Sequence, residues 1–201
     1  MKKSLGQQFI KNKTANEKII AALDLKPEKT VIEIGPGEGA LTFPLLKKGA
    51  RVIAIEKDLL LVERLKVGGK RKNLEIINGD ILKILPELPL TLHPKLSNYK
   101  LVGNIPYYIT GKLLRILSEL ENKPSLTILM IQKEVAERLT AKPPKMNLLA
   151  AAVQFWAEPK IIFTLKPTDF NPLPKVDSAA IKLTPLPSAL EANPENYYKF
   201  L

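Results

Sequence analysis

One segment constrains the fold more than any other: an apolar, β-rich run that ends in closely spaced glycines and leads directly into a helical pattern. It reads VIEIGPGEGALT over residues 31–42, with Gly35, Gly37 and Gly39 at the turn. Glycines let the backbone approach a ligand closely, and the N-terminus of the helix that follows favours electron-rich groups. The segment therefore predicts the first strand–turn–helix unit of a ligand-binding α/β sheet.

Acidic side chains end the next two predicted strands. Glu56 closes the strand in VIAIEKD, about twenty residues beyond the glycines, where a carboxylate can accept both hydroxyls of a ribose. Asp80 follows the strand in LEIINGDIL, where it can accept from an adenine amine. The glycines fall as G-x-G-x-G and lack the third glycine of G-x-G-x-x-G, which disfavours a dinucleotide-dependent oxidoreductase. Three strand ends should therefore form one nucleoside-binding cleft.

The rest of the chain alternates strand and helix patterns, which predicts an α/β fold with a mostly parallel sheet and helices on both faces. Strands are expected near residues 30–34, 51–56, 74–78, 99–103, 126–131, 160–165 and 178–183. Helices are expected near residues 15–24, 40–48, 58–66, 109–120, 132–140 and 146–156. Residues 166–177 form a proline-rich loop, so the last two strands should be an antiparallel hairpin. Trp156 and the apolar stripe of residues 109–120 should lie in the core.

The motif most informative about chemistry is the tetrapeptide Asn104-Ile105-Pro106-Tyr107. An exocyclic purine amine is a poor nucleophile because its lone pair is delocalised into the ring. The Asn104 side-chain oxygen and the Ile105 carbonyl can each accept one amine hydrogen, which favours a pyramidal nitrogen. Pro106 restricts the backbone around that carbonyl, and Tyr107 offers a face on which a base can stack. By itself the tetrapeptide fits an ordinary turn after a strand equally well.

Charge is consistent with a polyanionic partner. The chain holds 31 Lys plus Arg against 20 Asp plus Glu, for a net charge of +11 and a pI near 9.7. Lysines concentrate in residues 1–30, and residues 64–72 read RLKVGGKRK without an acid, so both segments are candidates for phosphate contacts. Either cluster could equally be a solvated surface.

Other classes of site are disfavoured by composition. The chain has no cysteine, which excludes disulfides and thiolate metal sites, and its single histidine, His93, lies in a polar loop and receives no role. No metal is expected. No apolar stretch approaches the length of a membrane span, so we expect a soluble, cytoplasmic protein.

Seven segments together carry a family resemblance. They read SLGQQFI, EIGPGEGALT, IEKD, NGDIL, GNIPYYIT, MIQKEVAERLTAKP and FNPLPKVDSAAIKL. In this order they resemble the ribosomal RNA adenine dimethyltransferases of the KsgA (RsmA) type, from Lys3 to about Leu183. The resemblance implies a Rossmann-like, S-adenosylmethionine-dependent methyltransferase fold, with a seven-stranded, mostly parallel sheet that ends in an antiparallel hairpin.

The same resemblance implies which residues hold S-adenosylmethionine on its methionine side. Those contacts fall on Gln8, Ile10, Gly35 and Gly37. The family usually has Asn where this chain has Gln8. Glutamine keeps the amide but adds a methylene, so the contact at position 8 is the least secure.

The remaining roles follow from the resemblance too. Glu56 would hold the ribose and Asp80 the adenine, and Asn104 would lie between cofactor and substrate. Phe170 would stack on the target base opposite Tyr107, although an aromatic residue in such a loop ordinarily anchors the loop itself. The catalytic residues expected are therefore Asn104, Ile105, Pro106, Tyr107 and Phe170.

The implied reaction is dimethylation of N6 of two adjacent adenines in a hairpin near the 3′ end of small-subunit (16S) rRNA, on the immature 30S subunit during assembly. We expect a monomer. Residues 1–185 would form the catalytic domain, and residues 186–201 the start of a C-terminal helical domain that is largely absent. The alternatives are the large-subunit (23S) rRNA methyltransferases of the macrolide-resistance type and a non-catalytic RNA-binding assembly factor.

Overall fold

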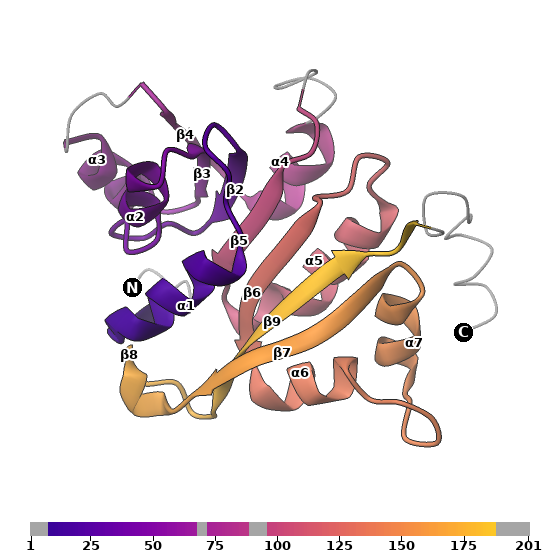
Figure 1. Cartoon of the computed structure of the whole chain (residues 1–201). Helices are drawn as coiled ribbons and strands as arrows, with labels where there is room; N and C mark the ends of the chain where they lie inside the picture. Colours follow the sequence, from indigo (N-terminus) through magenta and orange to yellow (C-terminus); the bar gives the residue numbers. More distant parts are fainter. Residues whose placement is uncertain (1–7, 68–71, 89–95, 188–201) are drawn as a thin grey trace.

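A seven-stranded sheet forms the centre of the molecule (Figure 1). The computed structural model describes residues 8–67, 72–88 and 96–187. The strands lie in the order β4-β3-β2-β5-β6-β9-β7. Their bounds are β2 Thr30–Ile34, β3 Arg51–Glu56, β4 Leu74–Asn78, β5 Lys100–Asn104, β6 Leu126–Gln132, β7 Ala157–Leu165 and β9 Ser178–Pro185. Each of the seven strands predicted from the sequence is confirmed, although β7 begins earlier than expected.

Strand directions confirm a mostly parallel sheet with an antiparallel end. Neighbours from β4 through β6 pair in parallel. Strand β9 pairs antiparallel with both β6 and β7, so the predicted hairpin of the last two long strands is present and β9 lies between β6 and β7. The carboxyl ends of the parallel strands lie at one edge of the sheet. After β2 the chain continues to β3 on one side of the central β2–β5 pair, whereas after β5 it continues to β6 on the other side. Ligands bind at such a switch point in open α/β sheets.

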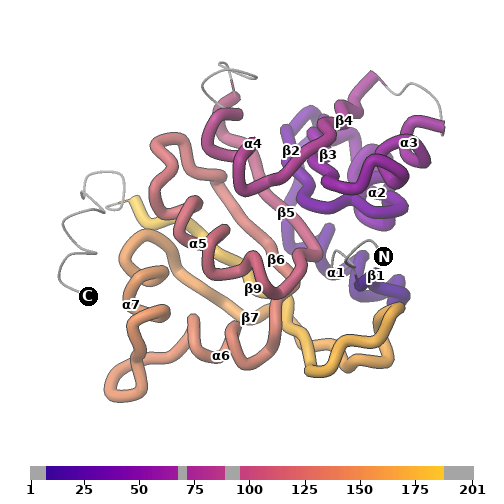
Figure 2. The backbone as a smooth tube through the Cα atoms, turned by 180° about the vertical axis from the view of Figure 1, so that it is seen from behind, coloured from indigo at the N-terminus to yellow at the C-terminus, as the bar shows by residue number. Residues whose placement is uncertain are grey.

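Helices cover both faces of the sheet. Their bounds are α1 Lys13–Ala22, α2 Thr42–Lys47, α3 Leu59–Val67, α4 Ile81–Glu87, α5 Thr110–Glu119, α6 Lys133–Leu139 and α7 Leu148–Gln154. Alternate residues of each strand point to opposite faces. Thus Ile32 and Ile53 join a core with α4 to α7, whereas Val31 and Val52 join a core with α1 and α2. Figure 2 shows α4 and α5 side by side on the first of these faces.

The predicted core residues are buried, except Ile116, which is half-buried. Leu113 and Leu117 of α5 are fully buried, and Trp156 is 1% exposed. Helix α4 was not predicted, because it is short and contains Pro86, which reads as a helix breaker in sequence. Its N-cap is Asp80, whose side chain accepts from the backbone of Leu82.

A second, two-stranded sheet joins distant parts of the chain. Strand β1 Phe9–Ile10 pairs antiparallel with β8 Phe170–Asn171, which follows a 3₁₀ turn at Pro167–Asp169. Residues 166–177 therefore contain a short strand and a turn, whereas the sequence predicts a loop throughout. This sheet places the N-terminal segment beside the carboxyl ends of the parallel strands (Figure 1).

Candidate functional site

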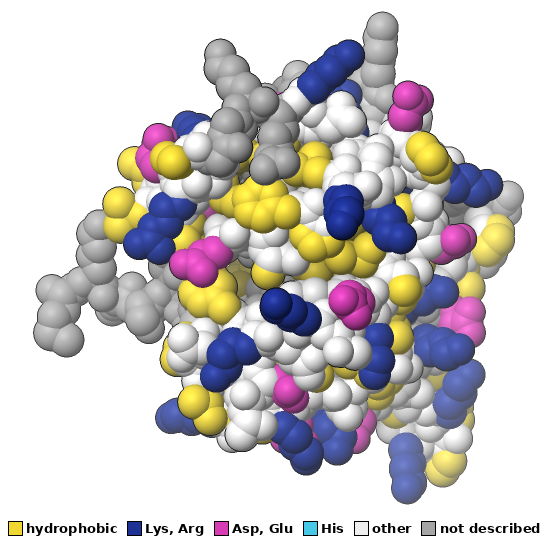
Figure 3. Space-filling view, turned by 60° about the vertical axis from the view of Figure 1, so that its left-hand side comes forward, with side chains coloured by type: hydrophobic (Ala, Val, Ile, Leu, Met, Phe, Trp, Pro, Cys, Tyr) yellow, Lys and Arg dark blue, Asp and Glu magenta, His cyan; other side chains and the backbone are white. Residues whose placement is uncertain are grey.

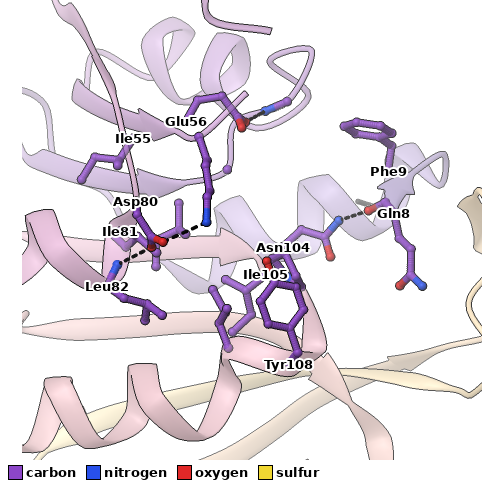
Figure 4. Close-up of a pocket in the computed structure, with 17 residues that line it drawn as sticks. Gln8, Phe9, Ile55, Glu56, Asp80, Ile81, Leu82, Asn104, Ile105 and Tyr108 are labelled. Atoms are coloured by element: carbon purple, nitrogen blue, oxygen red, sulfur yellow. Dashed lines mark hydrogen bonds and ion pairs between the residues drawn. The ribbon is translucent and has the colours of Figure 1, made fainter. Parts of the chain in front are cut away.

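A cavity opens where β2, β3, β4 and β5 end, with a volume of about 850 Å³ including its open mouth. Figure 4 shows the side chains that line it. Eight residues predicted for the site line this cavity: Gln8, Gly35, Gly37, Glu56, Asp80, Asn104, Ile105 and Pro106. Segments far apart in sequence thus meet in one place. The three remaining candidates, Ile10, Tyr107 and Phe170, do not line it.

The carboxylate of Glu56 is fixed by backbone donors. The N–H of Gly37 donates to Oε2 at 3.2 Å, and the N–H of Asp58 donates to Oε1 at 2.9 Å. Glu56 is only 3% exposed, yet it borders the cavity. Each oxygen has a further lone pair, so the carboxylate can accept hydroxyl hydrogens from a ligand while it keeps both backbone bonds.

A second buried carboxyl group lies beneath the glycine turn. Glu33 is 2% exposed, and Thr42 at the start of α2 donates to its Oε2 at 2.6 Å. Burial raises the pKa of Glu33 to about 7, against the opposing effect of the Thr42 hydrogen bonds, and the negative charge of Glu56 adds to the rise. The Glu33–Thr42 hydrogen bond connects the end of β2 to the start of α2, the helix that follows the glycines.

Asp80 is held from two sides. Lys57 donates to Oδ2 at 2.9 Å, and the N–H of Leu82 donates to Oδ1 at 3.0 Å. Burial acts to raise the pKa of Asp80, but the bonds from Lys57 and Leu82 outweigh it and the pKa lies below its ordinary value. The carboxylate is therefore ionised and oriented toward the cavity, where an amine donor could reach it.

Asn104 ends β5 at the centre of the cavity. Its side-chain nitrogen donates to the backbone carbonyl of Gln8. Figure 4 shows this bond and shows the Gln8 side chain extending away from Asn104. Position 8 therefore meets Asn104 through its backbone, and the additional methylene of glutamine does not disturb this contact.

The aromatic residues are arranged differently from the expectation. The hydroxyl of Tyr107 lies 2.7 Å from Oγ of Ser178, and its ring does not line the cavity. Phe170 is fully buried, because it pairs with Ile10 across β1 and β8 and packs in the core beside it. In this arrangement Phe170 anchors its own loop, and no part of its ring is exposed to a base. Ile10 is likewise a core residue.

Nine lining residues were not singled out from the sequence, and three of them carry an aromatic ring or a charge: Phe9, Lys57 and Tyr108. Tyr108 is 68% exposed and Phe9 is half-buried, so the ring of Tyr108 is the more accessible aromatic surface at the cavity. Phe9 lies against the glycine turn, and Lys57 bonds Asp80. Each adjoins a predicted residue in sequence, but only the side-chain directions show that these three face the ligand space.

Basic residues spread across the face shown in Figure 3. Lys11, Lys13, Lys18 and Lys26 are exposed. In the second predicted cluster Arg64 lies 3.3 Å from Glu38 and Lys66 lies 3.0 Å from Glu63, as surface ion pairs. Lys29 is half-buried and Lys72 is exposed, whereas Lys2, Lys3, Lys70 and Arg71 lie outside the described residues, as does His93.

Two types of structure are absent from the described part of the chain. It contains no group of three or more His, Cys, Asp or Glu side chains that could hold a metal ion. Within the same ranges, no helix combines the length and apolar character needed to cross a membrane.

Comparison with known protein families gives one consistent result. The family described as "Ribosomal RNA adenine dimethylase" matches residues 1–201. A Ribosomal RNA small subunit methyltransferase A from Dehalococcoides mccartyi is 44% identical over 90% of this chain. A protein of the same name from Koribacter versatilis is 37% identical over 100% of it. The chain spans 62% of the length of the first of these relatives and 75% of the second.

Solved structures agree. A dimethyladenosine transferase from Plasmodium falciparum superposes with a TM-score of 0.83 at 32% identity, covering 96% of this chain and 69% of that one. The 23S rRNA methyltransferase ErmE superposes with a TM-score of 0.78 at 28% identity, covering 95% of this chain and 76% of that one.

Proposed function

This chain belongs to the ribosomal RNA adenine dimethylase family, and from that premise we propose that it transfers methyl groups from S-adenosylmethionine to N6 of adenine in small-subunit ribosomal RNA. The observation that carries the proposal is the position of Asn104, whose amide lies in the same cavity as the glycine turn and the carboxylates of Glu56 and Asp80.

The cavity suits the proposed cofactor. Gly35 leaves backbone accessible for the amino acid end, since nothing lies within 4 Å of the place that a Cβ would occupy, and Gly37 borders the same cavity beneath Phe9. The fixed carboxylate of Glu56 would accept the ribose hydroxyls, and Asp80 would accept the adenine amine. When bound, S-adenosylmethionine supplies a methyl group on a positively charged sulfur, which leaves as a neutral thioether. The predicted role of Ile10 is then indirect: it supports β1 from the core while Gln8 and Phe9 border the cavity.

Two acceptors in this chain would activate the substrate amine. The side-chain oxygen of Asn104 and the backbone carbonyl of Ile105 would each accept one N6 hydrogen, which directs the nitrogen lone pair away from both. Pro106 limits the movement of that carbonyl, so the acceptors are in place before the base enters. After transfer the nitrogen carries a positive charge and releases one hydrogen as a proton to water. One hydrogen remains, so a second transfer is open.

The exposed ring of Tyr108 is the surface on which the base or its neighbour would stack. Stacking by Phe170 would require the β1–β8 pair to open, because Phe170 is fully buried in the closed arrangement. Tyr107, with its hydroxyl against Ser178, would support the turn from behind.

The substrate proposed is a pair of adjacent adenines in a hairpin near the 3′ end of 16S rRNA, met on the immature 30S subunit in the cytoplasm. The names of the relatives support the small subunit as target. We also propose that the protein acts as a monomer.

Transfer of labelled methyl groups to small subunits that lack the modification tests this function. We expect the wild-type protein to label two adjacent adenines. Asn104→Ala should lose roughly 10²–10³-fold in kcat while its affinity for S-adenosylmethionine changes little. Asn16→Ala is the control, because the Asn16 side-chain oxygen is buried without a hydrogen-bond partner and lies outside the cavity.

Mapping the labelled position separates the other functions. Label in 23S RNA, offered in parallel as a second substrate, would show the large-subunit activity instead, and failure to bind S-adenosylmethionine would support a non-catalytic assembly factor. Full transfer by Asn104→Ala would contradict the role given to that amide.

A further inference from the structure

The orientation of the Asn104 amide depends on one contact. A backbone carbonyl can only accept a hydrogen bond, so the Gln8 carbonyl selects the nitrogen end of the Asn104 amide and leaves its oxygen free. Within the described ranges, the structure gives the Asn104 side chain no other hydrogen bond. The oxygen is the atom that the proposed function requires as an acceptor. Residue 8 must therefore be held in place for Asn104 to present that oxygen.

The backbone pairing that holds this segment is short. Strands β1 and β8 contribute two residues each, through the pairs Phe9 with Asn171 and Ile10 with Phe170. A two-residue ladder is weak by itself, since isolated two-stranded pairs are marginally stable in water. A further attachment is needed to keep Gln8 against Asn104.

Asp169 supplies that attachment. Its Oδ1 accepts from Nδ2 of Asn12 at 2.9 Å, and its backbone carbonyl accepts from the N–H of Lys11 at 2.8 Å. Its Oδ2 accepts from the N–H of Lys166 at 2.9 Å, which fixes the carboxylate on its own turn. Asp169 therefore connects the N-terminal segment directly to the turn that precedes Phe170.

Asn12 completes the connection from the other side. Its Oδ1 accepts from the N–H of Ala15 at 3.1 Å, which makes it the N-cap of α1, while its Nδ2 donates to Asp169. Both ends of this amide are thus used, one to start a helix and one to bind the β8 turn. The position of Asn12 is fixed by α1, and Gln8 lies four residues before it.

We propose that Asn12 and Asp169 are positioning residues for methyl transfer: their hydrogen bond holds the N-terminal segment so that the Gln8 carbonyl orients the Asn104 amide. This inference rests on the proposed function of Asn104. Neither residue lines the cavity, so their effect on the reaction passes through the segment between them and Gln8. The carbonyl of Gln8 cannot be removed by a side-chain change, whereas the Asn12–Asp169 bond can.

Exchange of the two residues gives a direct test. In Asn12→Asp, two carboxylates face each other. In Asp169→Asn, one amide oxygen must serve both Asn12 and the Lys166 N–H, so one donor loses its partner. In the double variant the aspartate at position 12 accepts from Ala15 and from the new amide, and that amide accepts from Lys166. All hydrogen bonds and the net charge are then restored.

The kinetic expectation follows from misplacement of the Asn104 oxygen. Each single variant should lose about 10- to 100-fold in kcat for methylation of unmodified small subunits, with a smaller change in KM for S-adenosylmethionine. The double variant should return close to the wild-type kcat. The control is Asn147→Asp, because Asn147 also caps a helix through Ala150 and donates its Nδ2 to a carbonyl, that of Arg138, but lies outside the cavity. It should keep the wild-type kcat.

A second measurement does not depend on turnover. Nuclear magnetic resonance of the Asn104 side-chain amide should show one hydrogen protected from exchange in the wild type, unprotected in each single variant and protected again in the double variant. If Asn12→Asp fails to fold, Asp169→Asn carries the same test without an added carboxylate pair.

The outcomes distinguish the two proposals. A wild-type protein that does not methylate ribosomal RNA overturns the proposed function, while the amide measurement still reports on the Asn12–Asp169 linkage. An active wild type whose single variants match Asn147→Asp in kcat and keep the Asn104 hydrogen protected overturns the positioning role. A folded double variant that stays as slow as the single variants overturns it too.

Discussion

The ring of Phe9 lies directly against the α-carbon of Gly37. A Cβ added at Gly37 would come within 2.6 Å of Cε1 of Phe9, closer than real side chains approach. The glycine turn is therefore covered by the N-terminal segment through a contact that only glycine permits. Gly37 also donates its N–H to Glu56, so one glycine both contacts Phe9 and holds the Glu56 carboxylate.

Gly37→Ala should destabilise the protein more than Gly35→Ala. Both glycines have a positive φ, +58° and +62°, so each change costs about 1–2 kcal/mol of backbone strain. Only Gly37→Ala also displaces Phe9, which adds about 1–3 kcal/mol of overpacking. Urea denaturation measures the difference, and Phe9→Ala in the Gly37→Ala background should remove the excess. Gly111→Ala, in open space on α5, is the control and should be neutral or stabilising. Equal losses at positions 35 and 37 would contradict the contact.

Glu33→Gln should change how stability depends on pH. Burial raises the pKa of Glu33 to about 7, so the folded state keeps this proton at pH values where the unfolded chain has lost it. The stability that the neutral carboxyl supports is fully present below pH 4.5 and is lost as pH rises toward 7. Relative to Glu33→Gln, the free energy of unfolding of the wild type should fall by about 3 kcal/mol over that range. Denaturation of both proteins between pH 4 and pH 8 checks this, and parallel curves would refute it.

Lys57→Met should raise the pKa of Asp80. The pKa of this carboxyl is lowered although burial opposes it, because Lys57 and the N–H of Leu82 donate to it. The ionised form is thus present above the ordinary pKa of 3.8 and is lost as pH falls through the lower folded value. In the variant that loss should begin at higher pH, as a carboxyl ¹³C titration would show. Lys66→Met removes an exposed partner of Glu63 and should leave Asp80 unchanged. An identical titration in both variants would rule out the role of Lys57.

Tyr107 and Tyr108 should respond differently to loss of the hydroxyl. Tyr107→Phe removes a half-buried bond to Ser178 and should cost about 1 kcal/mol of stability. Tyr108→Phe removes an exposed hydroxyl and should cost almost nothing. A double-mutant cycle with Ser178→Ala measures the coupling at Tyr107. Coupling near zero would show that the two hydroxyls do not bond in solution.

Much of the sheet and most of the site could be predicted from sequence, because each feature has a local signal. Buried strands such as β2 and β3 are rich in Val and Ile, and the glycines and acids at or just after their ends mark the carboxyl edge. Because parallel strands end together, Gly35, Glu56 and Asn104 could be expected in one cavity.

The rest depends on contacts between distant segments. Strands β1 and β8 are too short to show a periodic pattern in the sequence, and they lie near opposite ends of the described chain. The hydrogen bond beside them, between Asn12 and Asp169, likewise joins residues 157 positions apart. Burial of Phe170 and exposure of Tyr108 follow from that pairing and from side-chain direction. No local pattern distinguishes Tyr107 from Tyr108, which are adjacent and chemically identical.

The position of β9 sets an order for synthesis. Among the strands of the described residues, β7 pairs with β9 alone, and β9 must also pair with β6 to bring β7 onto the sheet. A nascent chain that has emerged only as far as residue 177 therefore exposes one edge of β6 and holds β7 with no neighbour. The glycine turn and both cavity carboxylates are translated long before that point, so the residues that line the pocket are all synthesised before the strand that completes their sheet, although that strand adds no residue to the pocket lining.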